Sequence, residues 1–247
     1  MIRYNWIEDG NRQLDLVDAE DSAVLVNHPA YAATYIYGNV LIESDGEGNS
    51  QILHYGGDSG TTVDYRKGTL YFFHNTVIST RSGNTTLMRL STNEEHADVR
   101  NNIVYTTASG SHLAMLSESG VMDLRTNWLM DGWVDSHSGF SGSIVDYGSN
   151  IEGTDPGFHD FASQDFSPAP NSVCEDGGGP VRCGVAIGLD RWRPGGELQP
   201  EAGIAMLDDK RTLPIVFKRI RDGRVRVLLD DDRYVRKGGI TFHVVHH

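Results

Sequence analysis

The sequence predicts an all-β fold, a right-handed parallel β-helix in which short strands stack into a solenoid. Two observations predict it. Apolar residues alternate with polar ones along several short segments, and period-two alternation is typical of a β-strand. An Asn interrupts each of these segments, and the steps between successive Asn residues are 34, 36, 27 and 25. Repeats of about this length are typical of stacked supersecondary units. The five residues are Asn5, Asn39, Asn75, Asn102 and Asn127.

Each Asn is expected at a bend between two strands. Asn tolerates left-handed backbone angles, and its side chain can bond neighbouring backbone groups. One coil cannot bury its apolar face alone, so we expect neighbouring coils to stack around a continuous core and their Asn side chains to form a ladder. The polar loops 44–50 and 56–62 are expected to lie on one face, where insertions of this kind often build a binding cleft.

Other architectures fit the pattern less well. A β-sandwich would show hairpin turns at short regular intervals, and the few Asp-Gly pairs lie mostly in longer loops. Alternating βα units would need amphipathic helices, and the sequence shows none that is convincing.

The pattern divides the chain into three parts. Residues 1–150 are predicted as β-helix coils, 151–193 as an extended, Pro-rich capping segment that runs over the end of the stack, and 194–247 as a linker with a basic β-hairpin tail. A repeat begins directly after Met1, so the N-terminal end is predicted to be uncapped. We expect a fragment, or an open end that the tail or a partner covers, because unpaired strand edges invite self-association.

Composition limits the function classes. The net charge of −13 is uneven, since residues 191–247 hold 12 Lys and Arg against 8 Asp and Glu, whereas the rest hold 9 against 26. An acidic body repels nucleic acid and anionic membranes. No apolar run approaches the roughly 20 residues of a membrane helix. Cys174 and Cys183 could form a disulfide, and no zinc-ligand spacing exists.

The repeated strand–Asn–strand phrases, and the closing Asp155-Pro-Gly-Phe158, Asp165-Phe166 and Pro170-Asn-Ser172, carry a family resemblance. Over about residues 1–190 the chain resembles the pectate-lyase-like right-handed β-helix proteins, which are often described as secreted polysaccharide-active enzymes. The resemblance implies a secreted or periplasmic protein with a polysaccharide partner. The segment after Met1 does not have the pattern of a signal peptide, and the basic tail departs from the resemblance.

The resemblance further implies a lyase that cleaves a uronate-containing glycan by β-elimination. This reaction needs a base, and either Ca²⁺ or a basic side chain to neutralise the carboxylate. The cations of the acidic body are few, and the predicted catalytic residues are Lys67, Arg66, Arg89 and His54. The stacking of coils could place His54, Arg81 or Arg89, and Arg100 on one face. The predicted substrate-binding residues are Tyr55, Asp58, Tyr65 and Arg100.

Two alternatives stay open. Paired carboxylates could hydrolyse the glycan, or the chain could be a non-catalytic glycan-binding or structural β-helix, as in adhesins and tail spikes. No protein metal ligands are predicted, although Ca²⁺ could take part. Outward members of a group of six aromatic side chains could stack on sugars; the six are Tyr35, Tyr37, Tyr55, Tyr65, Tyr71 and Phe73. Asp58-Ser59-Gly60 is similar to a serine-protease loop, but the predicted solenoid makes a polar turn the better interpretation.

Overall fold

The computed structural model describes residues 1–19, 22–174, 202–206, 212–219 and 225–229. The chain forms two compact units, Met1–Ala186 and Ile187–His247. Within the described residues no helix is both long and apolar enough to cross a membrane.

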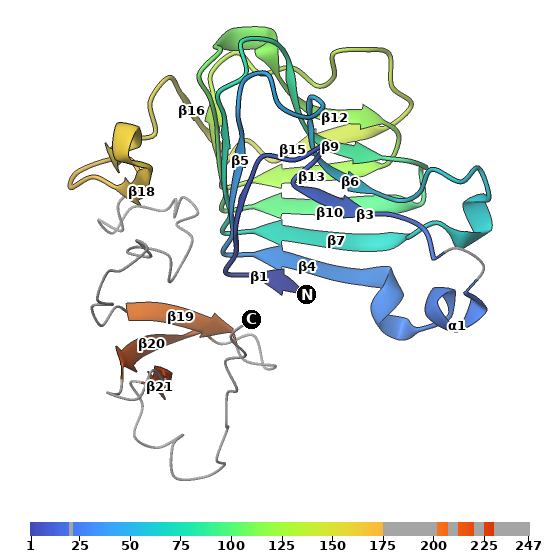
Figure 1. The fold of residues 1–247 in the computed structure, drawn as a ribbon, viewed down its shortest axis with the longest axis horizontal. Coiled ribbons are helices and arrows are strands. Elements are labelled where there is room, and N and C mark those ends of the chain that lie inside the picture. Colours follow the sequence, from blue (N-terminus) through green and yellow to red (C-terminus); the bar gives the residue numbers. More distant parts are fainter. Residues whose placement is uncertain (20–21, 175–201, 207–211, 220–224, 230–247) are drawn as a thin grey trace. The chain divides into compact units, whose positions relative to one another are not determined.

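The first unit consists mainly of three parallel sheets that the chain visits in a fixed order (Figure 1). We call each set of successive strands, one from each sheet, a coil. The first sheet contains β1 (Ile2–Arg3), β4 (Ala33–Tyr37), β7 (Gly68–Phe73), β10 (Glu95–Arg100), β13 (Val121–Arg125) and β15 (Ser143–Asp146). The second contains β2 (Trp6–Glu8), β5 (Val40–Glu43), β8 (Thr76–Ser79), β11 (Ile103–Thr106), β14 (Trp128–Met130) and β16 (Ile151–Gly153). The third contains β3 (Leu14–Leu16), β6 (Gln51–Tyr55), β9 (Thr85–Leu90) and β12 (Leu113–Glu118).

The prediction of an all-β fold with parallel sheets is therefore confirmed. Helical structure in the described residues is limited to single turns, which lie between the strands or in the C-terminal segment. They are α1 (Ala23–Val26), η1 (Pro29–Ala32), η2 (Thr62–Asp64), η3 (Gly110–His112) and η4 (Phe161–Ser163).

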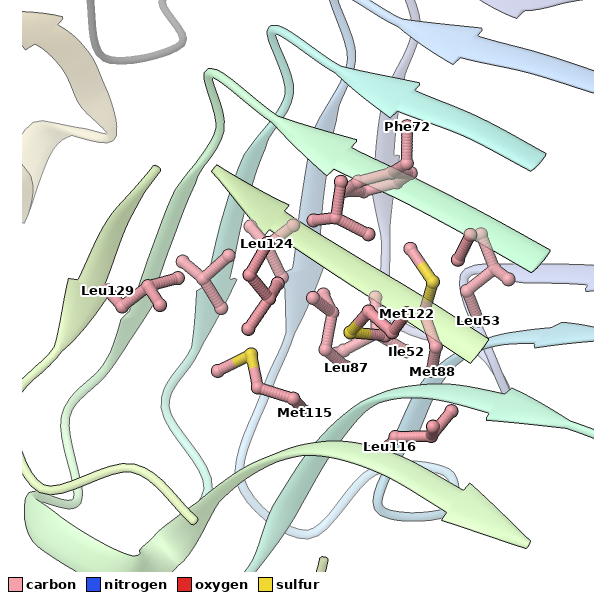
Figure 2. Packing of buried hydrophobic residues seen from close by; sticks show 14 of the residues in the cluster. Ile52, Leu53, Phe72, Leu87, Met88, Met115, Leu116, Met122, Leu124 and Leu129 are labelled. Atoms are coloured by element: carbon pink, nitrogen blue, oxygen red, sulfur yellow. The ribbon is translucent and has the colours of Figure 1, made fainter. Parts of the chain in front are cut away.

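The core lies between the three sheets and takes alternate residues from most strands; in the third sheet it also takes consecutive residues, namely Ile52-Leu53, Leu87-Met88 and Met115-Leu116. Residues paired in register repeat the same apolar character from coil to coil, so each buried side chain is covered by its counterparts above and below. Figure 2 shows Phe72 and Leu124 of the first sheet, Leu129 of the second, and Leu53, Met88 and Leu116 of the third converging in this space. All six are fully buried.

The predicted ladder of Asn side chains is present at the bend between the first and second sheets. In each step the Oδ1 of one Asn accepts two hydrogen bonds from the Asn of the preceding coil, one from its backbone N–H and one from its Nδ2. For Asn75 and Asn102 the two distances are 2.9 and 3.1 Å. The same pair of bonds joins Asn5 to Asn39, Asn39 to Asn75, Asn102 to Asn127, and Asn127 to a sixth member, Asn150.

The left-handed backbone at this bend belongs to the residue before the ladder Asn in the first five coils; before Asn150 it lies at Gly148 (φ 67°) instead. This corrects the expectation that the ladder Asn itself takes those angles. Positive φ is unfavourable for an aromatic or β-branched residue, and the repeated ladder bonds hold it in place. The residues are Tyr4 (φ 58°), Gly38 (66°), His74 (54°), Asn101 (54°) and Thr126 (54°).

The described part of the C-terminal segment packs against the second sheet. Its strands β17 (Phe158–Asp160) and β18 (Asp165–Pro168) pair antiparallel. Phe166 stacks on Trp6 of β2 with ring centroids 5.6 Å apart, and Phe161 meets Tyr105 of β11 at 5.4 Å. In residues 158–168 the segment lies on a sheet flank and not over the end of the stack, because its aromatic side chains cover outer apolar residues of the second sheet; residues 175–193 of the predicted segment lie outside the described residues.

Two other predictions involve the rest of the chain. Cys174 is disulfide-bonded, whereas Cys183 lies outside the described residues. In the second unit, β20 (Thr212–Arg219) and β21 (Val225–Leu229) form an antiparallel pair at the predicted hairpin. β19 (Ala202–Met206) pairs with β20 as a further strand, which the sequence analysis did not predict.

We predict that Asn102→Ala lowers the free energy of unfolding by at least about 2 kcal/mol, since buried donors of Asn75 lose their acceptor and each such loss costs roughly 1–3 kcal/mol. Asn84, which is exposed, supplies the matched control Asn84→Ala. Urea unfolding of both variants measures the difference. Equal midpoints for the two variants would contradict a stabilising ladder.

Candidate functional site

The outward face of the third sheet carries a group of charged side chains that neighbouring strands bring into line. Asp15 of β3 pairs in register with His54 of β6, and His54 pairs with Arg89 of β9. Their strand neighbours Leu14, Leu53 and Met88 are in the core, so these three side chains point outward. Three further residues form ion pairs with them. We call the six residues the charged row: Arg12, Asp15, His54, Asp58, Arg89 and Glu118.

His54 is the centre of the charged row and is completely buried. Its Nδ1 lies 3.1 Å from Asp15 Oδ1 and 3.5 Å from Asp58 Oδ2. Its Nε2 lies 2.8 Å from the Oγ of Ser91. Burial, assisted by the charge of Arg89, holds the pKa of His54 below its ordinary value against the opposite effect of Asp58 and Asp15. The imidazole is therefore neutral at neutral pH.

Two guanidinium groups flank His54, and carboxylates hold both of them. Arg12 Nη1 lies 3.1 Å from Asp15 Oδ1, and Arg89 pairs with Asp58 and Glu118, each at 2.8 Å. Burial lowers the pKa of Arg89, but the interactions with Glu118 and Asp58 outweigh it and raise that pKa above its ordinary value. The arginine side chains are only 13% and 17% exposed, whereas the three carboxylate side chains are 46–52% exposed.

The loop after β6 closes over His54 and is fixed at several points. Asp18 Oδ2 accepts the backbone N–H of Ser59 at 3.1 Å, and the hydroxyl of Tyr65 accepts that of Gly60 at 2.9 Å. Ser91 Oγ lies 3.1 Å from the N and 3.0 Å from the O of Gly57. At Gly56, where φ is 135°, a Cβ would lie 2.5 Å from Ser91 Oγ, so the close approach requires glycine.

Of the predicted catalytic residues, the structure brings His54 and Arg89 together, with the predicted ligand-binding residue Asp58 between them. The roles of all three remain predictions. Lys67 instead forms an ion pair with Glu94. The guanidinium of Arg66 lies over the ring of Tyr31, 4.4 Å from its centroid. Neither Lys67 nor Arg66 forms an ion pair with the charged row.

The prediction that His54, Arg81 or Arg89, and Arg100 line one face holds only for His54 and Arg89. Arg81 follows β8 and pairs with the buried Glu43 at 3.0 Å. Arg100 belongs to β10 of the first sheet, where it lies 5.7 Å from the ring centroid of Phe73. The variable coil length explains the error, because equal sequence steps do not reach the same sheet.

The two tyrosines predicted to bind substrate are buried. Tyr55 is fully buried and its hydroxyl donates to the Lys67 carbonyl at 2.9 Å. Tyr65 is 8% exposed and anchors Gly60. In these positions neither ring is accessible to a ligand. Both side chains therefore have a structural role next to the site.

The aromatic side chains of the first sheet stack on one another in pairs. Tyr35 and Tyr71 stack with centroids 4.8 Å apart and planes 10° apart, and Tyr37 and Phe73 stack at 4.9 Å and 9°. Each ring therefore has one face covered by its partner, and stacking of a sugar on these rings stays a prediction.

Four residues of the site and its surroundings were not predicted from the sequence: Arg12, Asp15, Ser91 and Glu118. Their only sequence signal is their distance from the ladder Asn of the same coil. Asp15, His54 and Arg89 follow their Asn residues by 10, 15 and 14 positions, and the loops of different lengths hide this relation. Among the described residues, no group of three or more His, Cys, Asp and Glu is placed to hold a metal ion.

Comparison with known proteins adds no relative: no family model, no curated protein and no solved structure matches the chain.

We predict that His54 makes the protein less stable as the pH falls below about 6.5, the ordinary pKa of His. Because the folded state holds the pKa of His54 below that value, the unfolded state binds more protons in this range, and protonation favours unfolding. Unfolding free energies measured between about pH 7.5 and pH 5 should fall more steeply for the unmodified protein than for His54→Gln. Parallel curves would show that His54 is not responsible.

Proposed function

We propose that the first unit is a right-handed parallel β-helix similar to the pectate-lyase-like proteins, and that it binds an extended polysaccharide along the outward face of the third sheet. The regular visiting order of three parallel sheets supports the β-helix. We assign the right-handed form to this β-helix because connections between parallel strands strongly prefer right-handed crossovers.

The observation that carries the proposal is that the charged row crosses four neighbouring strands, β3, β6, β9 and β12. Parallel strands lie about 4.8 Å apart, so the row extends roughly 14 Å along the stack. That length suits an extended chain better than a single small ligand. Its carboxylates are about half exposed and can accept hydrogen bonds from sugar hydroxyl groups, while the arginines beneath them fix their positions.

The proposed reaction is β-elimination on a uronate, with His54 as base; because His54 is fully buried, it accepts the proton through the hydroxyl of the half-buried Ser91, which lies 2.8 Å from its Nε2. His54 is the best base among the predicted catalytic residues because its lowered pKa leaves it neutral, whereas the raised pKa of Arg89 keeps that side chain charged. A uronate carboxylate would compete with Asp58 and Glu118 for Arg89. Because Asp58 and Glu118 already pair with Arg89, a second candidate function is glycan binding without turnover.

We predict that Arg89→Gln weakens polysaccharide binding by about 10-fold or more, since hydrogen bonds to charged groups contribute roughly 1.5–3 kcal/mol. Calorimetry with pectate, alginate, a glycosaminoglycan and a neutral glycan measures the affinity. The control is Arg125→Gln, which removes a guanidinium from the first sheet and should leave the affinity unchanged.

The same samples, with and without Ca²⁺, distinguish the two candidates. An increase in ultraviolet absorbance from an unsaturated product supports elimination, and binding without that increase supports the non-catalytic candidate. Absence of binding to every polysaccharide would contradict the proposal.

A further inference from the structure

We infer that Ser91, His54 and Asp15 form an acyl-transfer site that hydrolyses short-chain carboxylic esters, with Ser91 as nucleophile. The inference goes beyond the proposed polysaccharide binding and does not depend on it. The three side chains lie in series, with Asp15 Oδ1 3.1 Å from His54 Nδ1 and His54 Nε2 2.8 Å from Ser91 Oγ. A nucleophile within hydrogen-bond reach of a base that a third group orients is the general requirement for this chemistry.

The protonation pattern of His54 follows from its two neighbours. A neutral imidazole carries one proton, and the carboxylate of Asp15 can only accept, so the proton belongs on Nδ1. Nε2 then has a lone pair that needs a donor, because a buried acceptor without one is costly. Ser91 Oγ is that donor. The Gly57 carbonyl, 3.0 Å from Oγ, is a second acceptor for the same hydroxyl proton, and rotation of the hydroxyl group exchanges the two partners.

The charges around His54 suit a general base. Asp15 and Asp58 stabilise the imidazolium that forms when His54 accepts a proton, whereas burial and the charges of Arg89 and Arg12 disfavour it, so that the pKa of His54 is lowered and the resting imidazole is neutral. His54 is fully buried, whereas Ser91 retains partial exposure. The nucleophile is thus the member of the series that a substrate can reach, and the tight cover of Gly56 and Gly57 restricts it to small acyl groups.

The steps balance with water as the only co-reactant. Ser91 Oγ bonds to the ester carbonyl carbon as its proton passes to His54 Nε2, and the carbonyl electron pair moves to oxygen. The backbone N–H of Gly57 donates to Ser91 Oγ at 3.1 Å in the resting site; once Oγ has bonded to carbon, this N–H can donate to the adjacent oxyanion. The carbon–oxygen bond to the alcohol breaks, and the alcohol leaves with the proton from Nε2. Water, deprotonated by His54, then releases the carboxylic acid and restores Ser91.

The test is labelling of the whole chain with an alkyl fluorophosphonate, followed by mapping of the modified peptide by mass spectrometry. This reagent reports an activated serine and needs no knowledge of the natural ester. The expected result is modification at Ser91 in the unmodified protein. No modification, or modification only at another serine, would overturn the inference whether or not polysaccharide binding is found.

Variants distinguish chemical activation of Ser91 from a purely structural role of the residues around it. Ser91→Ala and His54→Gln should abolish labelling, whereas Ser59→Ala, in the exposed part of the covering loop, should label at the normal rate. Asp15 is a positioning residue. In Asp15→Asn the side-chain amide can donate to Nδ1 and moves the proton to Nε2, which can no longer accept from Ser91. Labelling should then fall by roughly 10³-fold or more.

Circular dichroism of each variant before labelling distinguishes this loss from unfolding. A folded Asp15→Asn protein that labels at the normal rate would show that Asp15 serves stability only, and would overturn the assignment. A burst of p-nitrophenol from p-nitrophenyl acetate, equal to the protein concentration, is the expected sign of an acyl intermediate on Ser91.

Discussion

The amide ladder at the bend between the first and second sheets is the interaction on which the other features depend. Each ladder Asn is paired with the next coil through its side chain and its backbone, and four of the six are completely buried. A slip by one residue would move every inward side chain to the outer face. It would also leave buried amides without partners. The ladder and the apolar core therefore specify the same register.

That register determines what the third sheet presents to its surroundings. Because Leu14, Leu53 and Met88 are directed inward in the same register, Asp15, His54 and Arg89 are directed outward in one line. This alignment lowers the stability of the fold, because it places an imidazole and two guanidinium groups in a partly buried layer. Carboxylates on neighbouring strands and in the loop after β6 compensate for the desolvation. The cost is local, and buried charge and perturbed pKa values of this kind are typical of functional sites.

The sequence was sufficient for the periodic features and insufficient for the site. Period-two alternation and the spaced Asn residues predicted parallel strands and the ladder, because each depends on a local pattern that repeats. Arg81 and Arg100 were grouped with His54 from sequence distance alone, and loops of different lengths make that measure unreliable. Asp15 and Ser91 could not be found, because they meet His54 only through pairing of β3, β6 and β9. Tyr55 was assigned to a ligand because alternation does not identify which side of a strand faces the core.

Hydrogen exchange of the Asn side-chain amides, followed by NMR, tests the central claim most directly. If the coils stack in the register described, the Nδ2 protons of Asn39, Asn75, Asn102 and Asn127 exchange far more slowly than those of the exposed Asn84. Exchange of all five side chains at similar rates would contradict the ladder, and with it the alignment of Asp15, His54 and Arg89.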